Sequence, residues 1–343
     1  MNIGVLTGGG DCPGLNAAIR AVVRRAVDKG NSVTGIKNGW QGLISSDFEP
    51  LDLRLVSGIL PIGGTFLGTS RTNPEKVPGG YDLILKNFQE ARLDALVAIG
   101  GDDTLSVALA LFDKGVPVVG VPKTMDNDVY GTDFCIGFYS AVSIVTDALD
   151  KLHSTASSHH RVMVLEVMGR EAGWVALLGG LGGGADWIVI PEVPSTMDHI
   201  VDHLDERRGL GKDFSIIVVA EGAVIPDIKA ESAGIGGDAF GHERLDKRGV
   251  GDAVSREIER RTGFETRVTV LGYVQRGGSP VVFDRILATR LGVEAVDLLN
   301  KGKFGVMTAL QGNQIAILSL KEAISKSPRK VDQELYELAR IFF

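Results

Sequence analysis

The chain has 343 residues, which suggests two domains at roughly 100 to 200 residues per domain. Its net charge of −7 argues against a general nucleic-acid-coating role, because neutralising a phosphate backbone needs a surplus of cations. Hydrophobic residues make up 44% of the chain and charged residues 23%, which excludes a largely disordered protein. Any phosphate that binds here must therefore meet local basic residues.

The cysteines and the apolar stretches indicate where the protein resides. Two cysteines in a chain of this length, Cys12 and Cys135, are typical of free thiols in a reducing compartment. The first ten residues lack a basic start and do not resemble a signal peptide. The longest uncharged stretch, 172–185, contains six glycines and is shorter than the ~20 residues of a membrane span. We therefore expect a cytoplasmic protein that is not membrane-bound.

Short apolar strands alternate with helical patterns along the chain. Strands that are almost wholly apolar are typical of a sheet buried on both faces, so the pattern predicts an α/β fold with mainly parallel sheets. We expect residues 226–251, which mix glycines with charges of both signs, to form a surface excursion or a lid. The expected strands, each with the helix that follows it, are 2–7 with 15–28, 95–99 with 104–114, 116–121 with 139–153, 161–167 with 174–181, 187–190 with 197–208, 215–220 alone, and 268–271 with 282–300.

Three polar clusters directly follow expected strands, where α/β sheets bind ligands. Residues 8–14 read GGGDCPG before a helix, which makes either a phosphate cradle or a purely structural turn. Asp102 and Asp103 come next, either as a magnesium site or as a solvated helix cap. In PKTMDND at 122–128, a carboxylate could accept a hydroxyl proton while Lys123 neutralises a phosphoryl group, or the segment is an Asx-rich turn. Two acid clusters after consecutive strands favour a site.

Arginines stand at several strand ends. Arg161 begins one expected strand and Arg170 follows its far end, while Arg267 enters a later strand and Arg276 lies beyond it. The planar guanidinium offers a fork of donors that suits phosphate. A single arginine is more commonly a solvated surface residue, but several at strand ends favour a phosphorylated substrate.

Taken together, these stretches resemble the phosphofructokinase family. The matching motifs keep the family order across about residues 4–312, and they are GGGDCPGLNAAIR at 8–20, GGTFLGTSR at 63–71, IGGDDTL at 99–105, PKTMDND at 122–128, SSHHRVMVLEVMGR at 157–170, AEG at 220–222 and ETRVTVLGYVQRGGSP at 265–280. The resemblance implies two Rossmann-like three-layer domains with the site between them. Residues 1–138 and 274–305 would bind the phosphoryl donor and Mg²⁺, and residues 139–273 and 306–343 would bind fructose 6-phosphate.

The resemblance also implies residue roles. Asp126 would deprotonate the 1-hydroxyl of fructose 6-phosphate, supported by Thr124 and Asp128, while Asp102 would hold Mg²⁺. Gly10, Arg71 and Asp103 would meet the donor. The sugar phosphate would contact a larger set, namely Thr124, Met125, Asp126, Arg161, Met168, Gly169, Arg170, Glu221, Arg267, Tyr273, Val274, Gln275 and Arg276. In bacterial relatives the counterparts of Arg161 and Arg267 reach across a subunit boundary, which implies a homodimer or homotetramer.

Two departures from the ATP-using pattern concern the donor. Most ATP-using relatives have GGDG or GGEG where this chain has GGDD, and many have Gly where Lys123 stands. A carboxylate at Asp103 would fill and repel the place of an ATP α-phosphate. A lysine at the position of Lys123 occurs in some ATP-dependent relatives too, so Asp103 is the residue that distinguishes a pyrophosphate user from an ATP user. The resemblance thus predicts reversible phosphoryl transfer from pyrophosphate, a step of glycolysis and gluconeogenesis, and the alternative is an ATP-dependent 6-phosphofructokinase.

Other functions are disfavoured by specific motifs. NAD kinases and some lipid kinases carry a similar GGDG element, but they lack MGR followed about a hundred residues later by QRGG. A non-catalytic sugar-phosphate sensor could lose the acid pair, whereas Asp102 and Asp126 are both present. We expect weak or absent nucleotide control, because Asp213 and Phe214 stand where allosteric relatives have further basic residues.

Overall fold

In the computed structural model, residues 1–228, 239–241, 245 and 248–343 are described, and most of the expected excursion at 226–251 lies outside them. The chain divides into two compact units. Unit 1 comprises Met1–Ser140, Gly237–His242 and Arg276–Arg329, and unit 2 comprises Ala141–Gly236, Glu243–Gln275 and Lys330–Phe343. Within the described residues, none of the helices combines the length and apolar character that crossing a membrane requires.

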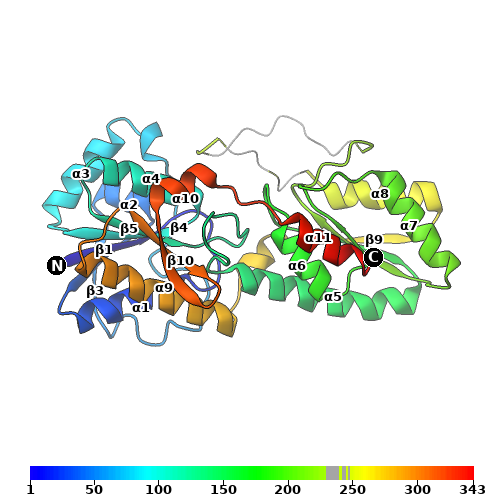
Figure 1. The fold of residues 1–343 in the computed structure, drawn as a ribbon, viewed down its shortest axis with the longest axis horizontal. Helices are drawn as coiled ribbons and strands as arrows, with labels where there is room; N and C mark the ends of the chain where they lie inside the picture. The colour runs from blue at the N-terminus through cyan, green and yellow to red at the C-terminus, as the bar shows by residue number, and fades with distance from the viewer. Residues whose placement is uncertain (229–238, 242–244, 246–247) are drawn as a thin grey trace. The chain divides into compact units, whose positions relative to one another are not determined.

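Unit 1 is built on a seven-stranded sheet in the order β11-β10-β5-β4-β1-β2-β3. The strands are parallel except β3 and β11, which pair antiparallel with β2 and β10. Figure 1 shows α1 and α9 along one side of this sheet and α3 and α4 on the other. The elements are β1 (Asn2–Thr7), α1 (Leu15–Asp28), β2 (Ser32–Ile36), α2 (Trp40–Ser45), β3 (Phe48–Leu51), η1 (Pro74–Lys76), α3 (Gly80–Glu90), β4 (Ala95–Gly100), α4 (Asp102–Asp113), β5 (Val118–Pro122), α9 (Val282–Asn300), β10 (Val306–Gln311), β11 (Gln314–Ser319) and α10 (Leu320–Lys326).

The register of the central strands aligns the polar clusters. Every residue of β4 and β5 is buried, as a sheet covered on both faces requires. Thr7 pairs with Ile99 across β1 and β4, and Gly100 pairs with Pro122 across β4 and β5. The three strands therefore end level with one another. The segments that follow them begin at the same edge of the sheet.

Unit 2 is built on a wholly parallel four-stranded sheet in the order β7-β8-β6-β9. Alternate side chains point to opposite faces, so Ile217 of β8 joins the core formed with α7 and α8, while Val218 lies against α6. The helix α5 continues from unit 1 into unit 2. The elements are α5 (Phe138–His159), β6 (Val162–Val167), α6 (Trp174–Gly182), β7 (Trp187–Val189), α7 (Met197–Gly209), β8 (Ser215–Ala220), α8 (Val250–Thr262), β9 (Thr266–Val270), η2 (Gly272–Arg276) and α11 (Gln333–Arg340).

The expectation of an α/β fold with mainly parallel sheets is confirmed, but the two units differ from the expected division at 306–329 and at the shorter stretches 139–140, 237–242 and 274–275. Residues 306–329 were assigned by resemblance to the second domain, whereas they belong to unit 1. The reason is strand pairing, since Val306 of β10 lies beside Val119 of β5 and β11 adds a hairpin to the same edge. Beyond residue 329, the tail that carries α11 belongs to unit 2. The strands β2, β3, β10 and β11 were not anticipated.

Candidate active site

The segment after β1 forms a tight turn that we call the glycine turn (residues 8–10). The amide of Gly8 donates to the carbonyl of Ile99 at 3.0 Å, which ties the turn to β4. The amide of Gly9 donates to Ser70 at 3.1 Å, and the Thr69 hydroxyl donates back to the Gly9 carbonyl at 2.7 Å. Gly9 has a φ of 77°, a left-handed conformation that favours glycine. The expected motif at 63–71 therefore braces the glycine turn.

Thr104 fills the space beneath the glycine turn. A methyl group on Gly8 would lie 2.6 Å from the Thr104 hydroxyl oxygen, and one on Gly100 would lie 2.3 Å from Thr104 Cβ. Thr104 belongs to the IGGDDTL motif but carried no expected role. The close packing explains why Gly8 and Gly100 must lack side chains.

Lys123 is almost fully buried, with 2% of its surface exposed. Its ammonium donates to the carbonyl oxygens of Gly8 at 3.0 Å and Gly10 at 2.5 Å. Burial lowers the pKa of Lys123, while the nearby carboxylate of Asp126 acts in the opposite direction. Lys123 was expected as a cation facing the donor. The structure gives it a further task, because its ammonium fastens both ends of the glycine turn.

Arg276 lies against the same turn. A methyl group on Gly10 would come within 2.2 Å of the Arg276 Nη1 atom. Unit 1 thus gathers Gly10, Lys123 and Arg276 from three distant parts of the sequence. Arg71, at the end of the bracing motif, is exposed. The Arg276 guanidinium and the Lys123 ammonium at a glycine-rich turn suit an anion with several phosphate oxygens.

The two acid clusters follow β4 and β5 at the same edge. Asp102 and Asp103 form the first turn of α4, where the helix dipole favours negative charge, and both are half-buried. Asp126 is also half-buried, and its amide donates to the Thr124 hydroxyl at 3.1 Å. Asn127, with a φ of 54°, accepts from the Cys135 amide at 2.8 Å and so fixes the turn. The carboxylate of Asp126 is therefore carried on an anchored loop.

The donor set is compatible with a magnesium ion. Magnesium commonly takes one or two carboxylates and completes its octahedron with substrate phosphate oxygens and water. Asp102 offers such a carboxylate on the first turn of α4, the helix whose Thr104 packs against Gly8. Within the described residues, no three or more His, Cys, Asp or Glu side chains gather into a metal site.

In unit 2, two loops meet at the carboxyl ends of β6 and β8. Gly169 has a φ of 142°, and its amide donates to the Glu221 carboxylate at 3.4 Å. A methyl group on Gly222 would lie 1.9 Å from the Arg170 carbonyl oxygen, so these backbones touch. Gln275 is completely buried and accepts from the Met168 amide at 2.8 Å. Its role in this structure is to hold the loop of Met168, Gly169 and Arg170.

Two other expected residues of η2 are open to solvent. Tyr273 is 63% exposed and Val274 is 66% exposed. Met125 lies in unit 1 and is buried beside Asp126. The residues expected to contact the sugar therefore include members of both units.

Arg161 and Arg267 lie at the opposite end of the unit 2 sheet. Arg161 precedes β6, and Arg267 pairs with Met163 at the start of β9. Both guanidinium groups form ion pairs with Glu265, which had not been expected, and the Arg161 contact measures 2.7 Å. The hydrogen bond from Arg161 lowers the pKa of Glu265. The six residues of β6, at about 3.3 Å each, separate this cluster from Arg170 by roughly 20 Å.

Comparison with known proteins agrees with this layout. The family model for phosphofructokinase matches residues 2–299. The chain belongs to the phosphofructokinase family. A relative from Amycolatopsis mediterranei named pyrophosphate--fructose 6-phosphate 1-phosphotransferase is 52% identical over the full length of both chains. A Corynebacterium efficiens relative named ATP-dependent 6-phosphofructokinase is 48% identical, over all of this chain and 99% of its own.

A solved phosphofructokinase structure supports the family fold. The Saccharomyces cerevisiae enzyme superposes with a TM-score of 0.81 at 32% identity. The match covers 94% of this chain and 45% of the yeast chain. Relatives with both donor names thus share the family, so the donor must be argued from residues.

Proposed function

We propose that this phosphofructokinase transfers a phosphoryl group from pyrophosphate to the 1-hydroxyl of fructose 6-phosphate, and that it works in both directions. The products are fructose 1,6-bisphosphate and phosphate, and loss of phosphate rather than ADP supports the reversibility. The observation that carries the choice of donor is Asp103, a carboxylate on the first turn of α4 and directly before Thr104, which packs against Gly8. Its charge disfavours the additional phosphate of a nucleotide.

In this proposal, Gly10, Lys123 and Arg276 form a cradle that binds the donor. Arg276 is thereby moved from the set expected around the sugar phosphate to the donor, and the support is that its guanidinium lies against Gly10. Asp126 accepts the proton of the 1-hydroxyl as the oxygen attacks the phosphoryl group, and the Thr124 hydroxyl keeps the Asp126 loop in place. The positive charges of the cradle offset the charge that the leaving phosphate carries. Asp102 would hold Mg²⁺, which would neutralise donor oxygens when bound.

We further propose a homo-oligomer in which Arg161 and Arg267 act on the sugar bound to a neighbouring subunit. The support is their position at the opposite sheet end from Arg170, since one phosphate cannot meet both ends of β6 in a single chain. Glu265 would hold the two guanidinium groups in a pair before the phosphate arrives.

A cytoplasmic location is also proposed. Cys12 and Cys135 are both free and buried, as expected in a reducing compartment.

A donor assay tests the proposal. With fructose 6-phosphate and Mg²⁺ in one buffer, pyrophosphate should support turnover and ATP should not. Turnover with ATP and none with pyrophosphate would establish the alternative, the ATP-dependent enzyme. Isotope exchange between labelled phosphate and fructose 1,6-bisphosphate would separate an enzyme from a sensor, which would show none.

Two substitutions at Asp103 separate charge from volume. Asp103→Asn removes the charge at nearly constant size, and Asp103→Gly removes both. If repulsion excludes ATP, both variants should gain ATP turnover and lose pyrophosphate turnover. If bulk excludes it, only Asp103→Gly should do so. Unchanged preference in both variants would remove the basis for assigning pyrophosphate.

A further inference from the structure

Asn16 is a buried residue that the proposed reaction does not use. It is the second residue of α1, and only 2% of its surface is exposed. Its Nδ2 atom donates to the carbonyl oxygens of Ile62 at 3.1 Å and Gly63 at 3.2 Å. Its Oδ1 atom accepts from the backbone amide of Phe66 at 2.9 Å. All three partners are backbone groups of the segment between β3 and η1, of which we call residues 61–66 the Asn16 loop.

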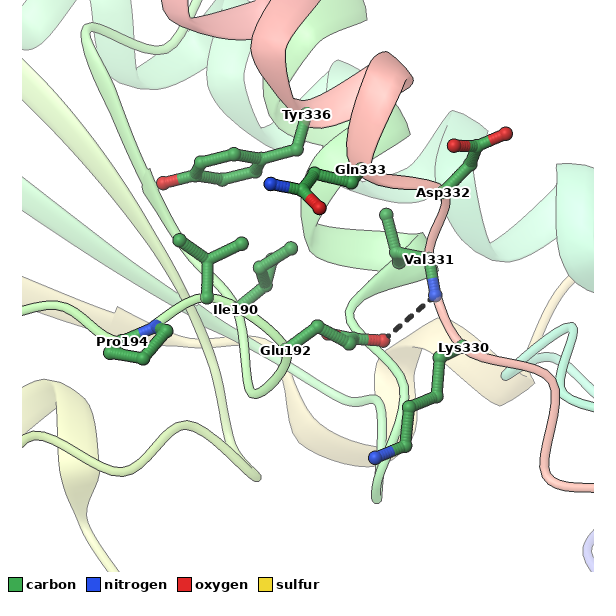
Figure 2. Close-up of a pocket in the computed structure, with 9 residues that line it drawn as sticks. Ile190, Glu192, Pro194, Lys330, Val331, Asp332, Gln333 and Tyr336 are labelled. Carbon is green, nitrogen blue, oxygen red and sulfur yellow. Dashed lines mark hydrogen bonds between the residues drawn. The ribbon is translucent and has the colours of Figure 1, made fainter.

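These hydrogen bonds hold the Asn16 loop in the way that pairing holds a strand. Carbonyl oxygens only accept and backbone amides only donate, so the partners also fix the orientation of the Asn16 side chain. Figure 2 shows a similar bridge in unit 2, where the Val331 amide donates to the Glu192 carboxylate at 3.0 Å. The same carboxylate accepts from the Gly173 amide at 3.0 Å. In each unit, one side chain thus orders a segment that lies between the strands and helices.

One end of the Asn16 loop touches the segment that carries Arg276. A methyl group on Gly63 would lie 2.0 Å from the Gly278 carbonyl oxygen, so the two backbones are in contact. The Ser279 hydroxyl donates to the Pro61 carbonyl at 2.5 Å. Gly278 is two residues from Arg276, whose guanidinium lies against the glycine turn. The position of the loop therefore limits where the backbone of Arg276 can lie.

The other end of the Asn16 loop leads to the glycine turn itself. The Thr7 hydroxyl donates to the Gly68 carbonyl at 2.8 Å, so the Thr65 hydroxyl donates to Thr7 at 2.9 Å. The next residues along the chain brace the glycine turn and end at Arg71. The loop thus lies between two segments that carry arginines, one ending at Arg71 and the other beginning at Arg276.

We propose that Asn16 is a positioning residue for the phosphoryl donor. The inference rests on the proposed function and adds to it a residue outside the cradle. By holding the Asn16 loop, the side chain fixes the backbone from which Arg71 and Arg276 approach the donor. A misplacement of about 1 Å in such a group can cost roughly 100-fold in rate. A side chain outside the cradle can therefore govern how well the donor is used.

Asn16→Asp tests this role with little change in size. The carboxylate keeps the acceptor for the Phe66 amide, but it loses both donors and faces the two carbonyl oxygens. Initial rates of the full chain are measured against pyrophosphate at saturating fructose 6-phosphate, and then with the roles of the two substrates exchanged. The KM for pyrophosphate should rise about 10-fold or more, as expected for a lost charge-assisted hydrogen bond. The KM for fructose 6-phosphate should stay within about twofold.

Asn87 supplies a matched control on α3. It is 7% exposed, and its Nδ2 atom donates to the carbonyl oxygens of Leu43 at 2.9 Å and Ile44 at 2.8 Å. Asn87→Asp therefore removes the same pair of hydrogen bonds from two consecutive carbonyls near the end of α2. Both variants should unfold at a lower temperature, but only Asn16→Asp should raise the KM for pyrophosphate.

Ser279→Ala tests the same link from the other side and decides the question if Asn16→Asp does not fold. Ser279 is exposed, so its loss should leave the unfolding temperature nearly unchanged. Removing its hydrogen bond to Pro61 should raise the KM for pyrophosphate about threefold. An unchanged KM in this variant would then overturn the inference.

The remaining outcomes are distinguishable. If Asn16→Asp folds with an unchanged KM for pyrophosphate, or raises both KM values alike, Asn16 does not position the donor. If Asn87→Asp raises the KM for pyrophosphate as much, the effect is general destabilisation and the inference fails. If the unmodified protein uses ATP and not pyrophosphate, the proposed function fails, and the KM for ATP in the same variants decides the role of Asn16.

Discussion

Gly10→Ala isolates the contact between the glycine turn and Arg276. The backbone of Gly10 lies outside the left-handed region, so alanine is allowed there. The new methyl group would lie 2.2 Å from Nη1 and 2.9 Å from Cζ of Arg276, whereas ordinary contact needs about 3.5 Å. The guanidinium must therefore retreat by more than about 1 Å, beyond hydrogen-bond reach of an anion in the cradle.

The cost should appear in donor use and not in folding. Losing a charge-assisted hydrogen bond is worth about 1.5 to 3 kcal/mol, which is roughly a 10- to 150-fold loss in kcat/KM for pyrophosphate. The obstacle is the far end of a flexible side chain, so stability should fall by less than about 1 kcal/mol. In the control Gly222→Ala, the obstacle is the Arg170 carbonyl oxygen at 1.9 Å, and the unfolding temperature should drop clearly.

A double-mutant cycle shows whether Arg276 carries the effect. Initial rates against pyrophosphate are measured for Gly10→Ala, Arg276→Ala and the double variant. If Gly10→Ala acts by displacing the guanidinium, the double variant should be no slower than Arg276→Ala alone. Losses that add, or an active Arg276→Ala beside an inactive Gly10→Ala, would refute the reasoning.

Three further predictions concern single side chains. Lys123→Met leaves the carbonyls of Gly8 and Gly10 without their buried donor. Thermal denaturation should show a loss of about 1 to 3 kcal/mol in the free energy of unfolding, together with lost pyrophosphate turnover. Unchanged stability would contradict the role of Lys123 in holding the glycine turn. Tyr273→His should make the KM for fructose 6-phosphate rise with pH through about 6.5, as the imidazolium loses its charge, while the unmodified protein shows no such limb. Burial raises the pKa of Cys12 to about 12 and that of Cys135 also upward, so a thiol reagent at pH 8 should label neither cysteine before unfolding, and one rapidly labelled thiol would disprove this.

The buried strands could be predicted because burial on both faces requires apolar residues at nearly every position. β4 and β8 are covered on both faces, and each reads as an uninterrupted apolar run that ends at a polar turn. By contrast, β11 is partly exposed along its whole length, and β2 contains a glycine and polar residues. Both β11, which lies at the edge of the sheet, and β2, which lies between β1 and β3, are specified by their partners and not by their own composition. That is why the hairpin β10–β11, and with it the extent of unit 1, was missed.

The candidate site also has a part that the sequence predicts and a part that it does not. The motifs locate Asp102, Asp126 and Lys123 correctly after their strands, because position along the chain fixes position at the sheet edge. The partners of these residues are set by contacts over long sequence separations. Lys123 meets Gly8 from 115 residues away, and nothing local indicates that its ammonium faces carbonyl oxygens.

This distinction also bears on which residue selects the donor. The Lys123 ammonium is buried and committed to two carbonyls of the glycine turn, so its loss would disturb the cradle for any phosphate donor. Asp103 stands half-buried on the first turn of α4, outside that tether, and its exchange leaves the turn supported by Lys123 and Thr104. A change at Asp103 therefore alters what the cradle accepts while the cradle keeps its shape. Substitutions of Asp103 should accordingly change the donor preference, and substitutions of Lys123 should disrupt the structure of the glycine turn.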